Sequence, residues 1–93
     1  MASTDHHTAY WEVQETRKLM ASTEPPHKVI VTMSRAHWGC FDFLVETVGY
    51  HPTRLVDLGE EAAREKGIPF MQEFPDMVAW MDQELSKEFA DAD

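Results

Sequence analysis

One short stretch of the chain decides the fold: residues 28–34 read KVIVTMS. Its side chains alternate between two faces, as they do in a β-strand. One face is apolar and consists of Val29, Val31 and Met33. The opposite face consists of Lys28, Ile30 and Thr32. This period of two predicts a short strand that turns its apolar face toward a core.

The spacing of apolar residues becomes helical after this strand. Ser34 is a good N-cap, and the helical pattern continues until Gly49. The first helix is therefore predicted over residues 35–48.

A second helix is predicted from a cap at Thr53 to Gly67. Gly59 lies inside this helix, where glycine costs about 1 kcal/mol relative to alanine. A glycine in that position indicates that another group packs closely against the backbone.

The segments on either side are also predicted to be helical. Asp5 can cap an N-terminal helix that runs to about Met20, after which Pro25 and Pro26 form a non-helical connector. Pro75 suits the start of an amphipathic, acidic C-terminal helix. The chain thus divides into an N-terminal helix with its connector (1–27), a central domain (28–67) and the C-terminal helix (68–93).

The composition limits the classes of protein to which the chain can belong. It has 93 residues, enough for one domain, and its 43% hydrophobic content is too high for a disordered chain. The single cysteine, Cys40, cannot form an internal disulfide. No apolar run reaches the ~18 to 20 residues that span a bilayer, and the N-terminus shows no secretion signal. We therefore expect a cytoplasmic protein that does not bind membranes.

The net charge of -9 argues against nucleic-acid binding when the chain is taken as a whole. The acidic residues are unevenly distributed, however. Residues 68–93 carry seven acidic side chains and one basic side chain, whereas residues 28–67 carry six acidic and five basic side chains. The central domain is thus nearly neutral, which leaves DNA binding open to it.

The predicted strand has no second strand in the chain with which to pair. A lone strand with two free edges is unstable and prone to aggregate, so it is expected to pair with its copy in a second chain. We therefore predict a homodimer of a mainly α-helical chain, with one short strand per chain.

The pattern of residues 28–67 resembles the ribbon-helix-helix superfamily, which includes the Arc and methionine repressors and many antitoxins. The resemblance rests on VIVTMS, the Ser34 cap, the helix that ends at Gly49, a short turn and a second capped helix. It implies a dimer whose two-stranded ribbon enters the DNA major groove, here with added N-terminal and C-terminal helices. The base-reading positions that it implies are Lys28, Ile30 and Thr32. The phosphate-binding positions that it implies are His51, Thr53 and Arg54.

No enzyme, cofactor or metal site is predicted. The carboxylates form no recognisable acid and base pair, and neither a nucleophile motif nor a phosphate loop is present. His37 and Cys40 lie three residues apart, and His6 and His7 add two imidazoles, but no complete metal-binding motif accompanies them.

The C-terminal helix has two interpretations. Its apolar stripe either packs on the chain's own domain or binds a protein partner, as antitoxin tails bind their toxins. The partner-binding residues would be Met77, Trp80, Met81 and Leu85.

Two functions follow from these patterns. The first is a dimeric, antitoxin-like transcriptional regulator that binds an operator in DNA. The second is an acidic protein-interaction or inhibitor module that keeps the ribbon-helix-helix scaffold and binds no DNA.

Overall fold

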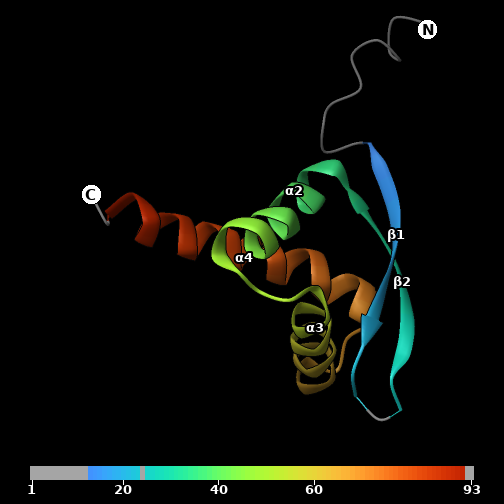
Figure 1. Cartoon of the computed structure of the whole chain (residues 1–93). Coiled ribbons are helices and arrows are strands. Elements are labelled where there is room, and N and C mark those ends of the chain that lie inside the picture. Colours follow the sequence, from blue (N-terminus) through green and yellow to red (C-terminus); the bar gives the residue numbers. More distant parts are fainter. Residues whose placement is uncertain (1–12, 24, 92–93) are drawn as a thin grey trace, which may run out of the picture.

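The computed structural model describes residues 13–23 and 25–91, which form a two-stranded hairpin followed by helices (Figure 1). The helices lie against one side of the hairpin, and α4 extends away from it (Figure 1). In chain order the elements are β1 (Gln14–Ala21), β2 (His27–Ser34), α2 (Arg35–Phe43), the π-helical turn η2 (Leu44–Val48), α3 (Pro52–Lys66) and α4 (Phe70–Asp91).

The partner of β2 is β1 of the same chain, so the prediction of one strand per chain is wrong. The two strands are antiparallel, with Leu19 opposite Val29 and Thr16 opposite Thr32. The predicted N-terminal helix is also wrong where it overlaps β1, and the rest of it, residues 1–12, lies outside the described residues. Because β2 has an intrachain partner, the argument for a ribbon-helix-helix dimer fails. Homodimerisation stays a prediction, now without that support.

Charged side chains on the inner face of β1 explain why this strand was missed. Glu15 and Arg17 point toward the helices, where a strand pattern would normally show apolar residues. The guanidinium of Arg17 donates to Asp42 at 2.9 Å and lies 4.3 Å from the ring centroid of Trp38. The Trp38 indole N–H in turn donates to the Glu15 carbonyl at 2.8 Å. These partners let two charged residues occupy an inward position without an unsatisfied polar group.

Local capping determines where the helices begin and end. Ser34 is confirmed as the N-cap of α2, since its hydroxyl accepts the His37 N–H at 3.1 Å. Gly49 is confirmed as a helix end, with a φ of 105°, and so is Gly67, with a φ of 71°. The last turn before Gly49 is π-helical, because the Gly49 N–H donates to the carbonyl of Leu44, five residues earlier. The Tyr50 N–H donates to the same carbonyl.

The C-terminal segment belongs to the core. Phe74 and Val78 are fully buried, and Gly59 in α3 packs closely on α4, as its position predicted. A Cβ atom at Gly59 would lie 2.7 Å from Cδ1 of Phe74. Pro75 lies inside α4 and not at its start, although proline removes an interior helical hydrogen bond. The aromatic packing of Phe70 and Phe74 on α3 holds the turn that precedes this proline.

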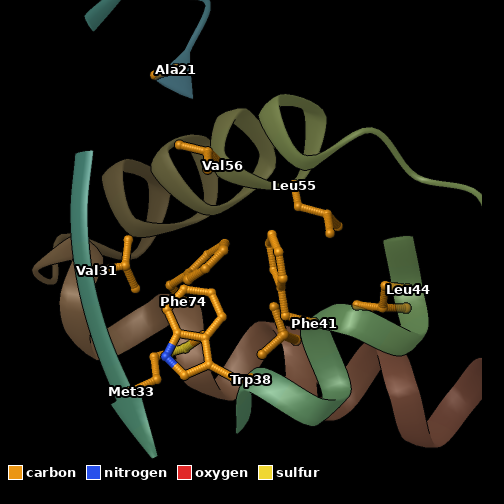
Figure 2. Close-up of a cluster of buried hydrophobic side chains, with 10 residues drawn as sticks. Ala21, Val31, Met33, Trp38, Phe41, Leu44, Leu55, Val56 and Phe74 are labelled. Atoms are coloured by element: carbon orange, nitrogen blue, oxygen red, sulfur yellow. The ribbon is translucent and has the colours of Figure 1, made fainter. Parts of the chain in front are cut away.

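The core lies between the inner face of the hairpin and the helices (Figure 2). Trp38 packs edge-on against Phe41, with ring centroids 5.2 Å apart, and Phe41 contacts Phe74. The other fully or nearly buried side chains of this cluster are Ala21, Val31, Met33, Leu44, Leu55, Val56 and Val78. Among the described residues, no helix is both long and apolar enough to cross a membrane.

Candidate nucleic-acid interface

The face of the hairpin that points away from the helices is the main candidate site. We name it the outward face. It consists of Gln14, Thr16, Lys18 and Met20 of β1 and of Lys28, Ile30 and Thr32 of β2. All seven side chains are exposed, because the helices cover only the opposite side of the sheet (Figure 1).

The outward face is basic and free of carboxylates, and its polar side chains alternate with the exposed apolar side chains of Met20 and Ile30. The Oγ1 atoms of Thr16 and Thr32 lie 2.7 Å apart and share a hydrogen bond across the strands. Lys18 lies opposite Ile30, and Lys28 lies opposite Met20, so the two ammonium groups occupy diagonal positions. Neither lysine forms an ion pair with a described residue. This patch is therefore positive in a chain whose net charge is -9.

The three predicted base-reading residues lie together on this face. Lys28, Ile30 and Thr32 point outward, while Val31 and Met33 are buried, in agreement with the alternation along β2. Sequence reasoning missed the half of the site that β1 contributes. The alternation of Thr16 and Lys18 with Leu19 could have revealed that half, had Arg17 not interrupted the apolar face.

The predicted phosphate-binding residues lie on a different element. His51, Thr53 and Arg54 are at the start of α3, where His51 and not Thr53 is the N-cap. The Nδ1 atom of His51 accepts the Thr53 N–H at 3.1 Å, and Pro52 has no N–H to offer. Neither Pro52 nor Thr53 therefore has a free backbone N–H to donate to a phosphate. The exposed Arg54 side chain is the main cationic group there.

Contacts between the hairpin tip and α3 hold the outward face in place. The His27 Nε2 and the Glu60 carboxylate are 2.9 Å apart, and the Asp57 carboxylate accepts hydrogen bonds from the backbone and hydroxyl of Ser22. The Pro25 carbonyl, followed by Glu60, raises the pKa of His27 above its ordinary value. The Ser22 hydroxyl lowers the pKa of Asp57.

The base of the hairpin is held by a second set of polar contacts. Arg35 Nε donates to the Glu15 carboxylate at 3.0 Å, beside the pair between Arg17 and Asp42. The outward face is therefore supported at both ends of the hairpin, which favours a rigid, preformed surface.

The histidine and cysteine considered as metal ligands have other partners. The Nδ1 atom of His37 lies 2.8 Å from the Ser34 hydroxyl. Burial, together with the nearby Asp82 carboxylate, raises the pKa of the Cys40 thiol to about 12. Among the described residues, no group of three or more His, Cys, Asp or Glu side chains could hold a metal ion. His6 and His7 lie outside the described residues.

The predicted partner-binding residues of α4 divide into two groups. Met77, Met81 and Leu85 are partly buried against the core, whereas Trp80 is 62% exposed. Packing on the chain's own domain therefore accounts for most of this stripe but not for Trp80.

Comparison with known proteins finds no matching protein-family model, no similar curated protein and no similar solved structure. The resemblance to ribbon-helix-helix proteins therefore stays a prediction from the sequence.

Proposed function

We propose that this chain binds double-stranded DNA through the outward face of its hairpin and acts as a transcriptional regulator. The observation that carries the proposal is the outward face itself. It presents Lys18, Lys28, Thr16, Thr32 and Gln14 without a single carboxylate, in a chain with 17 acidic residues.

The shape of the hairpin suits the DNA major groove. That groove is about 12 Å wide and accepts a two-stranded antiparallel ribbon. Strand side chains on one face are then directed at the base edges. Lys28 and Lys18 would donate to guanine O6 and N7, and Gln14 would form a bidentate pair with adenine. Ile30 would contribute apolar contact with a thymine methyl group.

The distribution of charge is compatible with an approach by this face alone. α4 carries six acidic residues and one basic residue, and it lies on the helical side of the hairpin (Figure 1). Phosphates near the hairpin would be separated from most of this acid by the sheet and the core. Because few cations face the DNA, binding should be weak on random sequence and should depend only modestly on salt.

Two substitutions that each replace one lysine by a glutamate test this proposal. Lys28→Glu removes a cation from the outward face, whereas Lys87→Glu makes the same change on α4, where Lys87 is 3.6 Å from Glu84. A duplex is first selected from a random pool at about 50 mM salt, and binding is then measured by fluorescence anisotropy. Lys28→Glu should abolish binding, and Lys87→Glu should change it little.

Milder substitutions separate base reading from general attraction. Lys28→Ala should lose about 1 to 3 kcal/mol on the selected duplex and much less on random DNA. Arg54→Ala tests the predicted phosphate contact on α3 separately, and an equal loss on both duplexes would support that contact. If the pool yields no bound duplex, or if the two charge-reversed variants behave identically, DNA binding by the outward face is wrong.

A further inference from the structure

Helices α3 and α4 pack against each other on the helical side of the molecule (Figure 1). Side chains of both helices line a groove on their surface. It consists of two adjoining hollows, of about 510 Å³ and about 310 Å³, that share Ala62, Met77 and Trp80. Leu58 and Met81 extend its apolar floor. We name this surface the α3–α4 groove.

Trp80 is the unexplained residue of this groove. Its exposed fraction of 62% exceeds that of Ile30, Met20 or Met71, although its neighbours Met77 and Met81 are partly buried. An exposed tryptophan beside a concave apolar floor is the arrangement in which a partner gains most from contact, because tryptophan is enriched among the residues that dominate binding free energy.

The rim of the α3–α4 groove is acidic. Glu61 and Glu65 line it from α3 and Asp76 lines it from α4, and all three side chains are exposed. None of these carboxylates forms an ion pair with a described residue. The lysine at one end, Lys66, is already paired with the buried Glu73 at 2.9 Å. The groove therefore presents uncompensated negative charge around an apolar centre.

These features specify the chemistry of the occupant. Both walls are helices, whose backbone groups bond within each helix, so the groove offers no strand edge with which an extended peptide could pair. A bound segment must satisfy its own backbone, which favours a helix that lays apolar side chains on the floor. Charge complementarity requires this helix to be basic on its flanks. A second copy of the chain, with a net charge of -9, would be repelled.

We propose that the α3–α4 groove binds a cationic amphipathic helix of a partner protein. Apolar side chains of that helix at spacings of three and four cover Trp80 and Met77, and its Lys and Arg residues face Glu61, Glu65 and Asp76. The site lies on different elements from the outward face, so the proposal stands or falls independently of DNA binding.

The test uses the full chain and a synthetic peptide as the probe. The peptide is a helix of roughly 18 residues, about 27 Å long, with Leu on one face and Lys on the other. One control peptide has the same composition in scrambled order, which destroys the apolar face. Another has Glu in place of every Lys. Fluorescence anisotropy of labelled peptide should show saturable binding of the amphipathic Lys peptide alone.

Variants of the chain locate the binding site. Trp80→Ala should weaken peptide binding at least thirtyfold, while Met71→Ala, on the same helix but outside the groove, should leave binding unchanged. Because Trp80 is largely exposed, its truncation should leave the melting temperature nearly unchanged, which circular dichroism verifies.

Matched carboxylate variants test the acidic rim. Glu61→Gln with Glu65→Gln should weaken binding several-fold and flatten its salt dependence. Glu46→Gln with Glu88→Gln makes the same change in net charge at exposed positions outside the groove and should have little effect.

Three results would overturn the proposal. The first is equal binding of the scrambled peptide, which would mean attraction by net charge alone. The second is unchanged binding by the folded Trp80→Ala variant. The third is a dimer of this chain in sedimentation that becomes a monomer in the Trp80→Ala variant. That result would mean that the groove binds a second copy of the chain.

Discussion

At the scale of single residues, the two glycines inside helices differ in what surrounds them. A Cβ atom at Gly59 would meet Cδ1 of Phe74 at 2.7 Å and Cε1 of Phe70 at 2.9 Å, whereas a Cβ atom at Gly39 would meet nothing within 4 Å. Alanine favours a helix over glycine by about 1 kcal/mol at either position. At Gly59 this gain is opposed by overpacking, which costs typically about 1 to 3 kcal/mol.

Gly59→Ala should therefore lower the free energy of unfolding, and Gly39→Ala should raise it by up to about 1 kcal/mol. Urea unfolding monitored by circular dichroism measures both. If Gly59→Ala also raised the free energy of unfolding, α4 would not pack on α3 as closely as it does in the structure.

At the scale of elements, α4 carries side chains that complete the core. Phe74 and Val78 are fully buried, and α4 contacts α3, α2 and η2. Truncation after Gly67 should therefore abolish cooperative thermal melting, because it removes these side chains and exposes the Trp38 and Phe41 cluster. A finer test compares two truncations within α4. Phe74→Ala should lower the free energy of unfolding by about 3 to 5 kcal/mol, because Phe74 is fully buried. Met71 is 41% exposed, so Met71→Ala should change the free energy of unfolding little. Cooperative melting of the truncated chain would contradict this assignment.

The contact between the hairpin tip and α3 should depend on pH. The pKa of His27 is raised above 6.5, first by the Pro25 carbonyl and then by Glu60. The stabilisation from protonated His27 is then fully present below pH 6.5 and is lost as the pH rises through the folded-state pKa. The melting-temperature difference between the chain and its His27→Gln variant should thus be larger at about pH 5.5 than at about pH 8.5.

A neighbouring hydrogen bond that a hydroxyl donates provides the control. The hydroxyl of Thr23 donates to the same Glu60 carboxylate at 3.2 Å, so Thr23→Val should lower the melting temperature equally at both pH values. An NMR titration of the His27 imidazole should also give a lower pKa in Glu60→Gln. Equal effects of His27→Gln at both pH values would contradict the predicted linkage.

At the scale of the whole molecule, the sequence predicted the second half of the fold better than the first. The alternation of β2, the Ser34 cap and the helix-ending Gly49 are strong local signals, and each appears in the structure as predicted. β1 was missed because its inner face depends on distant partners for Arg17, namely Asp42 and Trp38. For the same reason only half of the outward face was predicted. Contacts between residues far apart in sequence, such as Arg17 with Asp42, leave no local pattern in the sequence.

The pairing of β1 with β2 within one chain leads to the last prediction, which separates this fold from a ribbon shared between two chains. Thr16 and Thr32 lie directly opposite each other, are exposed, and have Oγ1 atoms 2.7 Å apart, a geometry close enough for a disulfide. The variant Thr16→Cys with Thr32→Cys is made together with Cys40→Ser, so that no other thiol competes. After oxidation, a non-reducing gel should show the single-chain mass of 10.7 kDa at every protein concentration. The cross-link should also stabilise the chain by about 3 kcal/mol, because it closes a loop of roughly 16 residues. If oxidation instead yields a two-chain product whose share rises with concentration, β2 pairs between chains, and the hairpin described for the single chain is wrong.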